Sequence, residues 1–215
     1  FIVFSAHGLR EGLCYAALSD AAKRQDPLLA TCRDMAGREG RFPEHGDELG
    51  QFITPIFPED GPRETRLRLA AALLSDVAWR VNPDYRGEQA FRRVLRAPFA
   101  AINHQERALI ALAVFARYKG DLNDDATLPG RALIDDKLAH WALKLGLGMR
   151  LAHALTGGTA GLGGVRLEAG EKTLIMKVPA NGEALLGEVV QRRLEALAKV
   201  CGLGTAIEVA GKKAS

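Results

Sequence analysis

Residues 66–96, RLRLAAALLSDVAWRVNPDYRGEQAFRRVLR, decide the fold class of this chain. Apolar residues run almost without interruption from Leu67 to Trp79, and at 100° per residue they fall on both sides of a helix. A helix that is apolar nearly all round belongs in the middle of a helical domain. We therefore predict a central helix over residues 62–81. Asp76 lies in one of its apolar faces, where a carboxylate is costly unless it is paired or bound to a metal.

The composition is that of an ordinary globular protein. Hydrophobic residues make up 47% of the 215 residues and charged residues 26%. No apolar run reaches the length of a membrane span, and no signal peptide is visible. The formal net charge of +3 is too small to indicate a nucleic-acid partner. Three scattered cysteines without metal-ligand spacing fit a reducing compartment. We expect a cytoplasmic protein that binds neither membrane nor nucleic acid.

Residues 25–155 are expected to form one all-helical domain. Pro27 suits the first turn of a helix, and Asn103 followed by Glu106 has the spacing of a capping box. The last long helix is expected over residues 132–155, with an interruption at Gly146 and Gly148, because glycine disfavours helix.

The composition changes at Thr156, where TGGTAGLGG indicates a linker. Alternation of apolar and polar residues over 165–178 then predicts a β-hairpin, followed by a helix over 183–200 and a short strand over 205–209. Residues 156–215 are thus predicted to form a small α+β module packed on the helical part. At the other end, residues 1–4 read as a buried strand, so we expect a fragment whose N-terminal part is missing.

Positive charge is concentrated near the predicted central helix. Between residues 63 and 96 there are eight arginines, four acids and no lysine. Guanidinium groups bind phosphate oxygens in a two-pronged geometry that lysine cannot adopt. The alternative is a solvated basic face with pairs one helical turn apart, such as Glu88 with Arg92. The residues predicted to bind polyphosphate are Arg63, Arg66, Arg80, Arg86, Arg92, Arg93 and Arg96.

His45, Ser75 and Asp76 have the pattern of a degenerate HD site. In the HD superfamily, a histidine on one helix and a His-Asp pair on a later helix hold a divalent metal. Here Ser75 stands where the second histidine is expected, and a site without that ligand binds metal poorly. We therefore predict no metal at this site, and a structural Asp76 that pairs with Arg80 or His45.

The chain resembles the exopolyphosphatase/guanosine pentaphosphate phosphatase family. Its GLREG segment at residues 8–12 is similar to the end of the catalytic part of these proteins. The order that follows is also similar to theirs: an HD-like helical domain with His45 and AALLSD, then NPDYRGEQ, a capped helix ending in ARYK at residues 116–119, and a small α+β tail. Where relatives often have Tyr-His, this chain has Tyr118-Lys119.

The resemblance implies a fold, a substrate class and partners. It implies a mainly α fold, in which residues 1–24 are a remnant of an actin-like domain, residues 25–155 an HD-like helical domain and residues 156–215 the small α+β module. Family members remove terminal phosphate from inorganic polyphosphate or pppGpp, and their C-terminal domains grip the anionic chain and form a homodimer. The catalytic glutamate and the magnesium site belong to the preceding actin-like domains. We therefore expect no catalytic residue and no cofactor in this chain, and no hydrolysis of polyphosphate by it alone.

Two alternatives remain open from the sequence. One is a degenerate or stand-alone HD-type metal-dependent phosphohydrolase, against which Ser75 argues. The other is a purely structural scaffold that binds no phosphate near the arginines.

Overall fold

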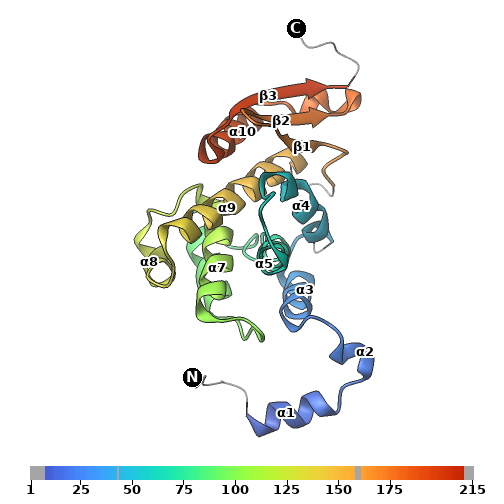
Figure 1. The fold of residues 1–215 in the computed structure, drawn as a ribbon, viewed down its shortest axis with the longest axis vertical. Coiled ribbons are helices and arrows are strands. Elements are labelled where there is room, and N and C mark those ends of the chain that lie inside the picture. Colours follow the sequence, from blue (N-terminus) through green and yellow to red (C-terminus); the bar gives the residue numbers. More distant parts are fainter. Residues whose placement is uncertain (1–7, 43, 158–160, 211–215) are drawn as a thin grey trace.

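A computed structural model describes residues 8–42, 44–157 and 161–210 of the chain. Most of these residues are helical, and a small sheet lies near the C-terminus, as predicted. In Figure 1 a body of packed helices occupies the middle, the sheet covers one end, and two short helices, α1 (Leu9–Ala16) and α2 (Asp20–Lys23), project from the other end. The strand predicted at residues 1–4 lies outside the described residues.

The helical body follows the start signals in the sequence. The Asp26 side chain accepts hydrogen bonds from the N–H groups of Leu28 and Leu29 at the start of α3, and Asn103 with Glu106 forms the predicted capping box of α7. The elements of the body are α3 (Pro27–Glu39), α4 (His45–Ile53), η1 (Thr54–Ile56), α5 (Pro62–Leu73), α6 (Arg86–Arg96), α7 (His104–Lys119), η2 (Asp125–Thr127), α8 (Leu128–Arg131) and α9 (Asp136–Thr156).

The predicted central helix ends earlier than the sequence indicated. Helix α5 stops at Leu73, and residues 74–81 continue as successive turns in which N–H groups bond the carbonyl three residues back, as Trp79 does to Asp76 at 3.1 Å. Two side-chain contacts compete with the helical ladder here: the Ala78 N–H donates to the Tyr118 hydroxyl, and Asp76 is drawn toward Arg117. Tertiary contacts therefore override the helical pattern of the sequence.

The predicted interruption of the last long helix is wrong. Helix α9 is continuous from Asp136 to Thr156, and its glycines serve packing instead. A Cβ on Gly146 would lie 2.6 Å from the Ala113 carbonyl oxygen and would overlap the Ala116 Cβ. Helices α7 and α9 thus approach so closely that only glycine fits between them. Helix α7 is buried from Ala108 to Ala116 and lies at the centre of the body.

The C-terminal module is a three-stranded sheet with one long helix. Its elements are β1 (Arg166–Ala169), β2 (Thr173–Val178), η3 (Ala180–Leu185), α10 (Glu188–Cys201) and β3 (Gly204–Val209). Strand β2 is central, pairing antiparallel with β1 and parallel with β3. The predicted hairpin and last strand are confirmed, while the helix starts later than predicted because a 3-10 segment precedes it. Helix α10 packs on α9, which joins this sheet module to the helical body (Figure 1). None of the described helices is long and apolar enough to cross a membrane.

Candidate anion-binding site

Asp76 is held by an ion pair across the helical body. Its carboxylate accepts a hydrogen bond of 3.0 Å from the Arg117 guanidinium of α7, and both side chains are largely buried, at 18% and 13% exposure. The predicted pairing of a buried Asp76 is therefore found, but with a different partner from the predicted Arg80 or His45. Arg117 is distant in sequence, so helical spacing around Asp76 could not indicate it.

Several arginines surround this single carboxylate. Arg41 and Arg86 lie near enough to Asp76 for their charges to act on it, in addition to Arg117. The guanidinium of Arg41 also lies 5.9 Å from the ring centre of Trp79, and that of Arg80 lies 5.1 Å from the same ring. We call Arg41, Arg80, Arg86 and Arg117 the Asp76 arginine cluster.

The cluster carries an excess of positive charge. Burial raises the pKa of Asp76, while Arg117, the Arg41 backbone N–H and the charges of Arg41 and Arg86 act to lower it. Burial also lowers the pKa of Arg117, and its Nε has no hydrogen-bond partner among the described residues. The Asp76 carboxylate thus interacts with three guanidinium groups, those of Arg41, Arg86 and Arg117, and Arg80 adds a fourth positive charge on the Trp79 ring, an arrangement that favours a further anion.

The other residues of the predicted HD site bind protein groups. The Nε2 atom of His45 accepts a hydrogen bond from the Gly161 N–H, and the neighbouring Glu48 accepts one of 2.8 Å from the Leu162 N–H. Ser75 Oγ lies 3.0 Å from Nε2 of His153. His45, Ser75 and His153 line a cavity of about 10 Å³, which is room for one water molecule at most. His45 and Glu48 therefore hold the start of the sheet module against α4.

The geometry does not fit a metal centre. Within residues 8–42, 44–157 and 161–210, no three His, Cys, Asp or Glu side chains lie close enough to hold a metal ion. Magnesium in particular needs several oxygen ligands in a nearly octahedral arrangement. The family resemblance places its magnesium in the preceding actin-like domains, and that expectation stays a prediction.

The sequence did not reveal the environment of His153, which lies on α9 beside Ser75. Burial lowers its pKa well below the usual value of 6.5, and the charges of Arg117 and His45 act in the same direction. Its Nε2 atom contacts the hydroxyl of Ser75, which lies in the turns that follow α5. Sequence periodicity indicated an ordinary amphipathic position, because it cannot show what packs against a helix from elsewhere in the chain.

We expect stability to fall as the pH drops below about 6.5, because the unfolded chain binds a proton at His153 that the folded chain refuses. When the pKa of a histidine is lower in the folded chain than in the unfolded chain, the protein has its full stability above the unfolded-state pKa. Its free energy of unfolding then decreases as the pH falls below that value. The slope from this one group is at most about 1.4 kcal/mol per pH unit. Urea unfolding as a function of pH should show a shallower slope for His153→Gln, and an unchanged slope for the exposed control His104→Gln. Equal slopes for wild type and His153→Gln would contradict this.

The arginines predicted from the sequence divide into two groups. Four have acidic partners: Arg63 with Glu106, Arg66 with Asp26, Arg92 with Glu88, and Arg93 with Glu39. The anticipated pair of Glu88 and Arg92 is thus present. The other three, Arg80, Arg86 and Arg96, form no salt bridge with an acid among the described residues. Two of these three, Arg80 and Arg86, belong to the Asp76 arginine cluster.

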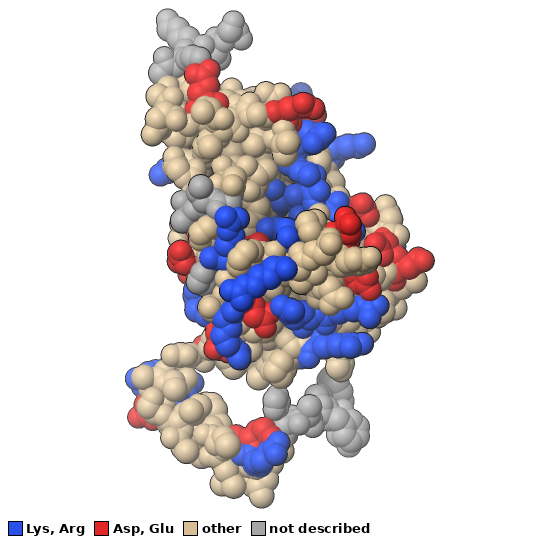
Figure 2. Space-filling model, turned by 180° about the vertical axis from the view of Figure 1, so that it is seen from behind, with Lys and Arg blue, Asp and Glu red and all other residues tan. Residues whose placement is uncertain are grey.

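The basic surface continues beyond the predicted stretch. The Arg150 guanidinium of α9 donates a 3.0 Å hydrogen bond to the Arg117 carbonyl, and the charges of Arg193 and Arg117 help to lower the pKa of Arg150. In Figure 2, Lys and Arg side chains spread over the helical body and up to the sheet module. Single-sequence reasoning missed Arg117, Arg150 and Arg193 because they come from three separate helices.

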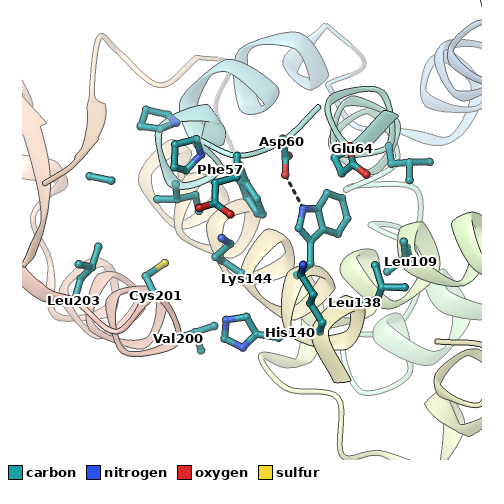
Figure 3. Close-up of a pocket in the computed structure, with 18 of the residues that line it drawn as sticks. Phe57, Asp60, Glu64, Leu109, Leu138, His140, Lys144, Val200, Cys201 and Leu203 are labelled. Carbon is teal, nitrogen blue, oxygen red and sulfur yellow. Dashed lines mark hydrogen bonds between the residues drawn. The ribbon is translucent and has the colours of Figure 1, made fainter. Parts of the chain in front are cut away.

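A second hollow lies between the helical body and the sheet module. It has a volume of about 770 Å³ and is bordered by η1, the first half of α9 and the end of α10 (Figure 3). Trp141 donates a hydrogen bond of 3.0 Å to Asp60, and Lys144 lies 4.3 Å from the ring centre of Phe57. Acidic and basic groups are mixed here, since Glu59 and Glu64 accompany Lys137 and Lys144. The hollow therefore has no clear preference for an anion.

Fold and site together define a mainly helical protein with a small mixed sheet and an arginine-rich surface. The family model for the exopolyphosphatase C-terminal region matches residues 28–207. The chain therefore belongs to the exopolyphosphatase C-terminal family. No curated protein matches it.

Proposed function

We propose that this chain is the polyanion-binding region of an exopolyphosphatase-type phosphatase, which removes terminal phosphate from inorganic polyphosphate or pppGpp. The observation that carries the proposal is the Asp76 arginine cluster, in which Arg41, Arg86 and Arg117 share one carboxylate and Arg80 shares the Trp79 ring with Arg41. Membership of the family supports the substrate class. In this proposal the chain itself performs no chemistry, and catalysis with magnesium belongs to actin-like domains of the whole enzyme.

The chemistry of the cluster suits phosphate. Guanidinium groups keep their charge at any physiological pH and donate paired hydrogen bonds to phosphate oxygens. Arg41 and Arg80 are exposed, so an extended anion can reach them without rearrangement of the core. Trp79 lies beneath both guanidinium groups and holds them in place by cation–π contact.

Two further features belong to the same proposal. The family resemblance leads us to propose a homodimer, located in the cytoplasm. It also leads us to propose that the helical body is a degenerate HD-like domain, in which the Arg117 guanidinium balances Asp76 where relatives of the superfamily place a metal. Arg117 thus gives Asp76 the positive partner that it requires when buried.

The proposal is tested by titrating labelled long-chain polyphosphate into the 215-residue chain. Arg41→Gln combined with Arg80→Gln should weaken binding by about tenfold or more, since each hydrogen bond to a charged group contributes roughly 1.5–3 kcal/mol. The matched control, Arg33→Gln with Arg38→Gln, removes the same formal charge from arginines already paired with Asp47 and Asp34. It should bind nearly as wild type does. Equal weakening in both double variants would show that only net charge matters, and no binding by wild type would refute the proposal. Competition with pppGpp distinguishes the two candidate substrates.

A further inference from the structure

The second hollow has the size and the position of a small-molecule site. Its volume of about 770 Å³ lies within the usual range of pockets that enclose a small organic ligand. Residues of η1, α5, α9 and the end of α10 border it, so it lies where the helical body meets the sheet module (Figure 3). Such meeting points are a preferred location of ligand pockets. The hollow is separate from the Asp76 arginine cluster, because no arginine of the cluster is among its described lining residues.

One wall of the hollow carries an aromatic side chain in a fixed orientation. Trp141 of α9 donates its indole N–H to Asp60 at 3.0 Å, and Asp60 also accepts a hydrogen bond from Arg68. The side chains of Arg68 and Asp60 are almost fully enclosed, at 5% and 7% exposure. The Phe57 ring packs against Trp141 with 5.5 Å between the ring centres and a tilt of 60°. These contacts hold the half-buried indole ring in place at the edge of the hollow.

Aliphatic side chains from both parts of the chain enclose the space beside the indole ring. In Figure 3, Leu109 and Leu138 of the helical body lie on one side of the hollow, and Val200 and Leu203 of the sheet module lie on the other. A flat ring that stacks on Trp141 loses its contact with water on both faces here. Stacking and burial of this kind are the main source of affinity for aromatic ligands.

The rim of the hollow carries unpaired charges of both signs. Glu59 precedes α5, while Lys137 and Lys144 belong to α9, and none of the three forms an ion pair with a described residue. A carboxylate only accepts hydrogen bonds, and an ammonium group only donates them. A strongly charged ligand of either sign is repelled by one of these groups. An uncharged ring with donors and acceptors on its edge can bind both kinds.

We infer that the second hollow binds the base of a purine nucleoside, which stacks on Trp141. Adenine, for example, has an amino group that donates and a ring nitrogen, N7, that accepts. The amino group matches Glu59, and the ring nitrogen matches the ammonium groups of Lys137 and Lys144. The inference is independent of the proposed function, because the site is separate from the Asp76 arginine cluster and its ligand needs no phosphate.

Protection of Cys201 from alkylation tests the inference, with adenosine as the ligand. Cys201 lines the hollow, whereas Cys14 is exposed on α1 and serves as an internal control. Saturating adenosine should slow the reaction of iodoacetamide with Cys201 in the 215-residue chain by about fivefold or more, because the ligand covers the thiol. The reaction of Cys14, followed in the same sample by mass spectrometry, should not change. Ribose, which lacks the base, should protect neither thiol.

Variants of the wall and the rim identify the groups that bind adenosine. Trp141→Leu removes the stacking surface and should weaken binding by about tenfold or more. Glu59→Gln removes a charged acceptor from an exposed position and should weaken binding by about threefold or more. The matched control, Glu195→Gln, removes an exposed carboxylate of α10 that does not border the hollow, and should bind as wild type does. If circular dichroism shows that Trp141→Leu is unfolded, the comparison of Glu59→Gln with its control decides.

Three results would overturn the inference. They are an unchanged rate for Cys201 at millimolar adenosine, equal protection by ribose, and equal affinity of wild type and Glu59→Gln for adenosine. None of these results bears on polyphosphate binding, which the Arg41→Gln/Arg80→Gln titration measures. Failure of the nucleoside site and failure of the proposed function are therefore distinguishable.

Discussion

Replacement of Asp76 by alanine is expected to lower the free energy of unfolding by about 3 kcal/mol, the range for breaking a buried ion pair. The change leaves the Arg117 guanidinium enclosed beside Arg86 with no counter-charge. It also removes the acceptor for the Arg41 backbone N–H. The loss is large because the remaining charge stays largely enclosed, although the intact pair itself adds little net stability. Urea unfolding followed by circular dichroism provides the measurement.

The controls for Asp76 separate charge from packing. Asp47→Ala breaks an ion pair with Arg33 in which both side chains are about half exposed, and it should cost at most about 1 kcal/mol. Asp76→Asn keeps the shape of the side chain and a hydrogen-bond acceptor, and should fall between wild type and Asp76→Ala. A cost for Asp76→Ala no greater than that for Asp47→Ala would contradict the buried pair. A melting temperature of wild type that rises with added manganese would contradict the absence of a metal site.

Replacement of Gly146 by valine is expected to destabilise the protein by about 3 kcal/mol, at the upper end of the cost of overpacking. The added carbons meet the backbone of α7 at Ala113 and the side chain of Ala116, and neither can move aside without separating the helices. The intrinsic preference of valine over glycine in a helix offsets only part of this.

Gly37 provides the matched control for Gly146. It also lies inside a helix, but a Cβ added there meets no atom within 4 Å. Gly37→Val should therefore leave the free energy of unfolding unchanged or slightly raise it. If Gly146→Val unfolds at the same urea concentration as wild type, the close approach of α7 and α9 is not a feature of the protein in solution.

The sequence predicted the fold class and much of the element order for local reasons. Asn103 and Glu106 satisfy each other's backbone groups within one turn, so their spacing alone identifies the start of α7. Alternation in the hairpin also depends only on neighbouring residues. The prediction of an interruption at Gly146 was wrong because glycine lowers helix propensity locally. Its role in this fold is to let α9 approach α7, a helix about 30 residues earlier in the chain.

The site was only partly accessible from the sequence for the same reason. The cost of burying Asp76 correctly required a partner, and the local excess of arginine includes Arg80 and Arg86 of the Asp76 arginine cluster. The number of arginines between residues 63 and 96 could not show that Arg63 and Arg66 are neutralised by acids from other elements. Nor could it show that Arg117, Arg150 and Arg193 extend the basic surface, because only the folded chain brings α7, α9 and α10 together.

The salt dependence of polyphosphate binding tests the central claim most directly. Bound cations on the polyanion are released when guanidinium groups replace them, so a plot of log affinity against log salt gives the number of contacts. Between about 50 and 200 mM salt, wild type should show a steep negative slope. The slope should become shallower by about one to two units in Arg41→Gln/Arg80→Gln, and should not change in Arg33→Gln/Arg38→Gln. Identical slopes for the two double variants would contradict the account.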